Sequence, residues 1–197
     1  MTQYNNDHDF TELTWAQHVQ TDDYEFSACN RQALREAFDQ VKDTATSILE
    51  IGVHRSGPED IRTSSHVFMT TKKPETKYIG IDIEDRSFLD NVNTNVFTIR
   101  MPSENIDVFN NFMNQNNFEK SFDFIFIDGW HSLNQVIKEW KLYVPMLKIG
   151  GIVGFHDTNF HPGPNIIIDA IDTNMFTVWK SCVENTDFGI AFAKRLV

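Results

Sequence analysis

Short apolar runs that end in polar residues recur along the chain. The segment 122–127, FDFIFI, contains five large apolar residues in six, and Asp-Gly-Trp-His-Ser follows it directly. Its length and its Ile and Phe content are typical of a buried strand. The same plan predicts four further strands: TSILEIG (46–52), KYIGIDIED (77–85), NVFTIRM (95–101) and GGIVGFHD (150–157), the last after a Gly-Gly turn.

Apolar residues at helical spacing lie between these runs. Leu34, Phe38 and Val41 predict a helix that begins near Arg31. Pro58 suits the first position of a second helix, because its missing N–H costs nothing there.

The residues after the 122–127 strand predict a longer helix. Ser132 and Gln135 fit an S-x-x-Q capping box. Pro145 indicates a kink in this helix or its end. The apolar stripe of the helix is Val136, Trp140, Tyr143 and Leu147. The remaining predicted elements are a short helix, NIIIDAID (165–172), and a closing hairpin of MFTVWKSCVE (175–184) and FGIAFAKRL (188–196).

Strands that alternate with helices predict parallel pairing, and continuously apolar strands predict a sheet covered on both faces. The predicted class is therefore α/β, a mostly parallel sheet with helices on both faces. Ligands bind such sheets beyond the carboxyl ends of the strands. Those ends carry Gly52 with VHRSG, Asp82 with Glu84, Met101 to Ser103, Asp128 with His131, and His156 with Asp157.

Composition narrows the class of partner. The 197 residues carry a net charge of −11 and a pI near 4.9, which argues against a nucleic-acid or anionic-membrane surface. No apolar run approaches the ~20 residues that span a bilayer, and the first residues lack a signal-peptide pattern. Cys29 and Cys182 form neither a disulfide framework nor a metal-binding spacing, so a reducing cytoplasm is the expected location.

Asp128 and Asp157 follow two consecutive predicted strands. Adjacent parallel strands lie about 4.8 Å apart, so the two carboxylates would share a cation or a proton. With His156 they suit a divalent ion such as Mg²⁺ or Mn²⁺, and His131 could face the same site as a general base. The structural alternative makes Asp128 a loop cap, His131 a surface residue and His156 a packed strand residue.

Gly52 and Asp82 follow the first two predicted strands. A glycine lets the backbone approach a ligand, although an ordinary strand-to-helix turn also uses one. Asp82 could accept hydrogen bonds from ribose hydroxyls, a role for which Glu84 competes, and a solvated acid is the structural alternative. The rigid loop NFHPGPN (159–165) could shape a substrate pocket or serve only as a connector.

Taken in order, ILEIGVHRSG, YIGIDIED, FDFIFIDGWHS and LKIGGIVGFHDTNFHPGP resemble the small class I S-adenosylmethionine-dependent methyltransferases. The resemblance is to the metal-dependent O-methyltransferase branch, which includes catechol-type, macrolide-sugar and cephalosporin-hydroxylase-like proteins. D-G-x-H with a downstream G-G-x-x-x-x-H-D-T is its specific part. The resemblance implies a Rossmann-like, seven-stranded, mostly parallel sheet with an antiparallel C-terminal hairpin over residues 27–197. Residues 1–26 remain as an N-terminal arm or lid that suits a homodimer contact.

The resemblance also implies roles for single residues. The cofactor S-adenosylmethionine would be bound by Glu50, Gly52, His54, Gly57, Asp82, Ser103 and Asp128. The metal would be bound by Asp128, His156 and Asp157, and the catalytic residues would be His131 and Asp128. Two positions depart from the family pattern: Ser56 replaces the second glycine, and Met101-Pro102 replaces the usual Gly-Asp.

The implied function is O-methylation of a small hydroxylated substrate, a sugar or an aromatic ring, with Mg²⁺ or Mn²⁺ assistance. Neither nucleic acid nor membrane is an expected partner. Two other classes stay open: a module that binds the cofactor without transfer, and a metal-dependent hydrolase or hydroxylase-like enzyme.

Overall fold

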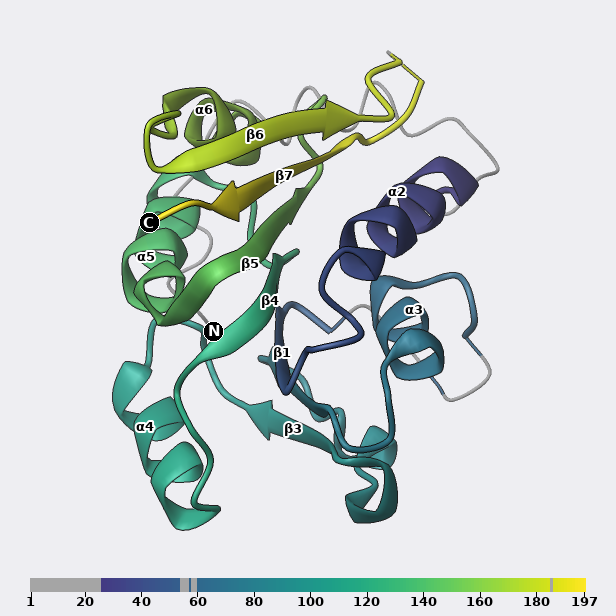
Figure 1. The fold of residues 1–197 in the computed structure, drawn as a ribbon, viewed down its shortest axis with the longest axis vertical. Coiled ribbons are helices and arrows are strands. Elements are labelled where there is room, and N and C mark those ends of the chain that lie inside the picture. Colours follow the sequence, from purple (N-terminus) through teal and green to yellow (C-terminus); the bar gives the residue numbers. More distant parts are fainter. Residues whose placement is uncertain (1–25, 54–56, 58–59, 185) are drawn as a thin grey trace.

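A seven-stranded sheet forms the centre of the protein (Figure 1). The computed structural model describes residues 26–53, 57, 60–184 and 186–197. The strand order is β3-β2-β1-β4-β5-β7-β6, in which β1 to β5 are parallel and β7 is antiparallel to both neighbours. The predicted fold class is confirmed. The strands are β1 (Ser47–Ile51), β2 (Lys77–Asp82), β3 (Val96–Arg100), β4 (Phe122–Ile127), β5 (Leu147–His156), β6 (Phe176–Ser181) and β7 (Ile190–Arg195).

Helices cover both faces of the sheet, as Figure 1 shows. One face carries α2 (Ala28–Asp39) and α3 (Ser64–Thr71). The other carries α4 (Ile106–Gln115), α5 (Leu133–Tyr143) and α6 (Pro162–Ala170). Short 3₁₀ turns occur at Ser87–Leu89, Val92–Thr94 and Val144–Met146. The last of these contains Pro145 and directly follows the end of α5 at Tyr143, so the helix ends next to the proline rather than being kinked by it.

Each strand contributes alternate side chains to two apolar layers. Leu49 and Ile51 of β1 belong to the layer under α4, α5 and α6, whereas Ile48 belongs to the layer under α2 and α3. In the second layer the ring of Phe124 lies 5.7 Å from that of Phe38, on α2. Full burial of one such side chain contributes about 1.5–3 kcal/mol, so these layers supply most of the driving force for folding.

Two helices differ from the sequence-based expectation. The helix α4 was not predicted, although Phe109, Phe112 and Met113 follow helical spacing and Phe109 and Met113 are buried. The prediction that the second helix begins at Pro58 is wrong, since α3 begins at Ser64. Thr63 caps it, accepting a hydrogen bond from the backbone of His66 at 3.1 Å. Pro58 itself lies outside the described residues, as do the arm 1–25 and His54.

The Gly-Gly pair lies inside β5 rather than before it. The strand begins at Leu147, and its pairing with β4 changes register between Phe122 and Phe124. Gly150 has a φ of +81°, which a side chain would strain. The predicted turn is therefore a bulge that lets β5 continue to His156.

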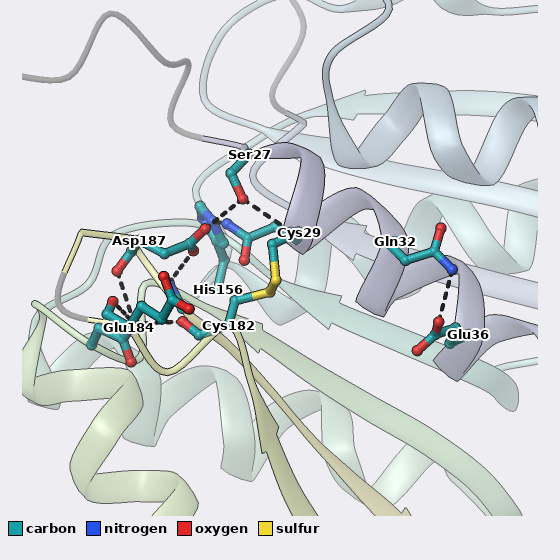
Figure 2. The surroundings of a disulfide bond; sticks show 11 residues. Ser27, Cys29, Gln32, Glu36, His156, Cys182, Glu184 and Asp187 are labelled. Atoms are coloured by element: carbon teal, nitrogen blue, oxygen red, sulfur yellow. Dashed lines mark hydrogen bonds between the residues drawn. A yellow bond between two sulfur atoms is a disulfide. The ribbon is translucent and has the colours of Figure 1, made fainter.

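A disulfide joins Cys29 on α2 to Cys182 just after β6 (Figure 2). The sequence-based expectation that these cysteines form no framework is wrong. Their separation of 153 residues has no local signal, and only the fold brings them together. The prediction of a cytoplasmic location assumed that both thiols are free. The disulfide removes that argument, because disulfides persist mainly in oxidising compartments. Among the described residues, no helix combines the length and the apolar character needed to cross a bilayer.

Candidate active site

The carboxyl ends of β2, β1, β4 and β5 lie side by side at one edge of the sheet. Asp82 is the last residue of β2, Gly52 follows β1, Asp128 follows β4 and Asp157 follows β5. The parallel pairing therefore brings these predicted residues to a common edge, as the strand-end rule requires.

Gly52 permits the closest backbone approach at this edge. Its φ is +83°, and a Cβ atom there would lie 2.0 Å from the carbonyl oxygen of Asp128. The backbone N–H of Asp128 in turn donates to the carbonyl of Ile51 at 2.8 Å. Only glycine fits here, so this residue fixes the loop after β1 against the loop after β4.

A cavity of about 380 Å³ opens beside these loops. Asp128, Gly129 and Trp130 of the FIDGWH segment line it, together with Gly52 and Asp82. Its volume lies in the range of small-molecule and cofactor sites. The FDFIFI strand thus ends in polar residues because the cavity begins at its carboxyl end.

Backbone groups hold the carboxylate of Asp82 at the cavity wall. Its two oxygens accept hydrogen bonds from Glu84 N at 2.8 Å and Val53 N at 3.0 Å, and Arg86 Nε lies 3.3 Å away. Glu84 also lines the cavity, but its side chain is 67% exposed and forms an ion pair with Arg86. Asp82 is therefore the better ordered of the two candidates for ribose.

Ser103 belongs to a polar cluster that also lines the cavity. Its hydroxyl donates to Glu139 Oε1 at 2.5 Å, and Gln135 Nε2 donates to the same carboxylate oxygen at 3.0 Å. Burial raises the pKa of Glu139 to about 7. The capping box is confirmed in one half only: Ser132 accepts from Gln135 N, whereas the Gln135 side chain turns to this cluster.

Glu50 is fully buried beneath the cavity edge rather than exposed in it. The hydroxyls of Ser64 and Tyr78 donate to its two carboxylate oxygens. Burial raises the pKa of Glu50 to about 7, although both hydrogen bonds act in the opposite direction. Gly57 is also buried, and neither residue is among those that line the cavity.

Asp128, Asp157 and two histidines form a compact charged cluster beside the cavity. His131 Nε2 lies 2.7 Å from Asp157 Oδ2 and 3.7 Å from Asp128 Oδ1. His156 Nδ1 lies 3.1 Å from Asp128 Oδ1 and 3.3 Å from Asp157 Oδ2. Because Asp128 also lines the cavity, it links this cluster to the cavity.

The electrostatics of the cluster follow from these distances. Burial alone would lower the pKa of His131, but the carboxylates of Asp157 and Asp128 outweigh it and raise the pKa to about 10. The same carboxylates raise the pKa of His156 well above its usual range against the effect of burial. In return, although burial opposes the change, the histidines hold the pKa of Asp157 well below its usual range.

The donor set fits a divalent cation. Asp128, His156 and Asp157 each offer one ligand atom, and these atoms lie within 4.8 Å of one another. Two buried carboxylates that share a site need a cation between them, and here two histidines fill that role. Carboxylate oxygens are suitable ligands for Mg²⁺ or Mn²⁺, and an imidazole is suitable for later transition metals.

A protein-family model described as "Methyltransferase domain" matches residues 49–158, more than half of the chain. The chain belongs to this methyltransferase family. The matched span runs from β1 to the residue after Asp157, so it includes the cavity edge and the charged cluster. A search of curated protein sequences finds no match.

Solved structures share the fold of this chain at low identity. MycE from the mycinamycin biosynthetic pathway, solved with Mg, SAH and mycinamycin VI, has a TM-score of 0.61 and 15% identity over 95% of this chain and 55% of MycE. An O-methyltransferase from Bacillus cereus, solved with SAH, has a TM-score of 0.57 and 16% identity over 95% and 91%. The calicheamicin methyltransferase CalS11 has 0.58 and 10% over 95% and 94%. The chain spans about half the length of MycE.

Two residues beside the charged cluster escaped the sequence-based prediction. Asn30 Nδ2 on α2 lies 3.0 Å from His156 Nε2, at a separation of 126 residues. His161 lies four residues after Asp157, and its backbone N–H donates to the Asp157 carbonyl at 3.1 Å. The D-x-x-x-H spacing was a local signal for His161, whereas Asn30 had none.

Proposed function

We propose that this protein transfers the methyl group of S-adenosylmethionine to a hydroxyl group of a small molecule, with a divalent ion at Asp128, His156 and Asp157. The observation that carries the proposal is that Asp128 belongs both to the cavity lining and to the charged cluster. It lines the 380 Å³ cavity, where a cofactor would bind, and it belongs to the charged cluster, where an acceptor would bind. The SAH in MycE and in the Bacillus cereus enzyme, and the Mg in MycE, support the choice of ligands.

Asp82 and the Ser103–Gln135–Glu139 cluster would orient the cofactor in the cavity. The carboxylate of Asp82 would accept hydrogen bonds from ribose hydroxyls, since backbone N–H groups already hold it in place. Bound S-adenosylmethionine would supply an electrophilic methyl group on a positively charged sulfur. A hydroxyl held next to Asp128 would then lie close to that methyl group, and this proximity accounts for much of the rate.

His131 is the proposed base. The substrate oxygen forms a bond to the methyl carbon, the carbon–sulfur bond breaks with its electrons left on sulfur, and the hydroxyl proton passes to His131. A divalent ion, when bound, would lower the pKa of the substrate hydroxyl and neutralise the carboxylates that now raise the pKa of His131. Asp157, 2.7 Å from His131 Nε2, orients the ring for this role.

The test is turnover of the full chain with a panel of hydroxylated sugars and catechols, read by mass spectrometry with added Mg²⁺ or Mn²⁺. We expect His131→Gln to lower turnover by roughly 10²–10⁴-fold, the usual size of a lost general base. Asp128→Asn should also lower turnover, because it removes a carboxylate ligand of the divalent ion. Asp107→Asn, at an exposed position on α4, is the matched control and should keep full turnover. Unchanged turnover in His131→Gln would remove this residue from the mechanism. Cofactor binding without any methylated product would instead favour a binding module.

A further inference from the structure

His161 has no evident role in the proposed methyl transfer. It is the cap residue of α6, and its side chain is only 7% exposed. Within the part of the chain that the structure describes, neither of its ring nitrogens has a hydrogen-bond partner. Buried polar groups are nearly always paired, so two orphan nitrogens on one ring indicate a missing ligand.

His131 and Asp157 are the groups that this ring faces. The rings of His131 and His161 lie 4.5 Å apart between centroids, and His131 Nε2 lies 2.7 Å from Asp157 Oδ2. His131, Asp157 and His161 each offer one ligand atom, and all three atoms lie within 4.8 Å of one another. This group shares Asp157 with the Asp128–His156–Asp157 group but contains two imidazoles instead of one.

The backbone holds these three residues in place. His161 N donates to the Asp157 carbonyl at 3.1 Å, which closes a tight turn between the two residues. Gly163, in the first turn of α6, packs closely against the loop after β4. A Cβ atom at Gly163 would lie 2.2 Å from the carbonyl oxygen of His131 in that loop. The ligand atoms therefore need little rearrangement to converge on an ion.

We propose that His131, Asp157 and His161 form a second metal site, which binds a transition-metal ion such as Zn²⁺ or Co²⁺ in preference to Mg²⁺. Two imidazoles and one carboxylate are a usual Zn²⁺ ligand set with a fourth position open, whereas Mg²⁺ takes oxygen ligands. Occupation of this site removes His131 as a base, so the ion inhibits methyl transfer. This inhibitory effect rests on the proposed function; the metal site does not.

The binding experiment uses the metal-free full chain and isothermal titration with Zn²⁺ in the presence of excess Mg²⁺. Wild-type protein should bind Zn²⁺ at least about tenfold more tightly than His161→Gln, because one ligand is lost. His66→Gln, on α3, is the matched histidine control and should bind like the wild type. Equal Zn²⁺ affinity in wild type and His161→Gln would overturn the proposal.

A second measurement needs no variant. X-ray absorption of the wild-type protein with one equivalent of Zn²⁺ counts the imidazole ligands. Two imidazoles are expected at the His131–Asp157–His161 site, whereas one imidazole would place the ion at Asp128, His156 and Asp157 and overturn the proposal.

Inhibition is measured separately from binding. At saturating Mg²⁺, the Zn²⁺ concentration that halves turnover should rise at least about tenfold in His161→Gln, each protein being compared with its own Zn²⁺-free rate. An unchanged Zn²⁺ sensitivity would contradict the inhibitory role. If the protein methylates no acceptor, the titration and the ligand count still decide whether the site exists.

Discussion

Glu50 shows how burial and hydrogen bonding compete at a single carboxyl group. Hydroxyls of Ser64 and Tyr78 donate to its two oxygens and favour the ionised form. Burial disfavours that form more strongly, and the result is a pKa of about 7 in the folded protein against 4.5 in a free side chain. A carboxyl group of this kind makes stability depend on pH.

Glu50 should therefore destabilise the fold as pH rises. Between pH 4.5 and 7 the folded state keeps a proton that the unfolded state has lost, so stability falls across this window and is then constant. Relative to wild type, Glu50→Gln should gain about 3 kcal/mol of unfolding free energy between pH 4.5 and pH 7.5, because Gln does not titrate. Urea denaturation at the two pH values measures the difference. Glu119→Gln, at an exposed position, is the control, and an equal response in both variants would contradict the assignment.

At the scale of elements, a disulfide joins α2 to an edge of the sheet that is distant from it in sequence. The disulfide joins its first turn to the residue after β6, and Ser27 Oγ donates to Asp187 Oδ2 at 2.6 Å beside it (Figure 2). Asn30, one residue after Cys29, contacts His156 in the charged cluster. The helix α2 therefore covers one apolar layer and also contacts His156 of the charged cluster.

Loss of the disulfide should lower stability without abolishing the fold. A covalent link across 153 residues restricts the unfolded chain, and such links contribute about 2–4 kcal/mol. We expect the double variant Cys29→Ser/Cys182→Ser to lose that amount in urea denaturation. A reductant should lower the stability of wild type to the same level and leave the double variant unchanged. If a reductant leaves the unfolding free energy of the wild type unchanged, the disulfide contributes little to stability.

At the scale of the whole molecule, two apolar layers leave one edge of the sheet for chemistry. The layers are built from alternate residues of the same strands, so side chains pack against both faces of the sheet. The cavity and the charged cluster lie at their carboxyl ends, where loops rather than packed side chains form the surface. Ligand binding at this edge should therefore be coupled to the stability of the entire fold.

S-adenosylhomocysteine should raise the melting temperature. At a free concentration of 100 Kd, a ligand that binds only the folded state adds about 2.7 kcal/mol, which for a domain of this size is roughly 5–10 °C. Differential scanning calorimetry measures the shift. Homocysteine, which lacks the nucleoside, should have no effect, and Asp82→Asn should reduce the shift. No shift at millimolar S-adenosylhomocysteine would count against the cofactor assignment.

The sequence predicted the strands well because each is a short run rich in apolar and β-branched residues, and β1, β2 and β4 are buried along most of their length. The acids at the strand ends were found for the same reason, since Asp82, Asp128 and Asp157 interrupt such runs. Two features escaped the prediction: α4, whose apolar residues are interrupted by asparagines, and the Gly-Gly bulge, which resembles a turn when read locally. His161 was named only as part of a rigid loop, because its burial depends on the packing of α6.

The sequence by itself determined the alternation of strands and helices, the edge of the sheet that carries the polar residues, and the identity of most residues in the charged cluster. These features depend on neighbours within a few positions of the chain. Only the tertiary structure decided the Cys29–Cys182 disulfide, the Asn30–His156 contact and the pairing of His131 with His161. The physical reason is that each of these contacts joins segments 30 to 153 residues apart, and no local periodicity records which distant side chains the packed layers bring together.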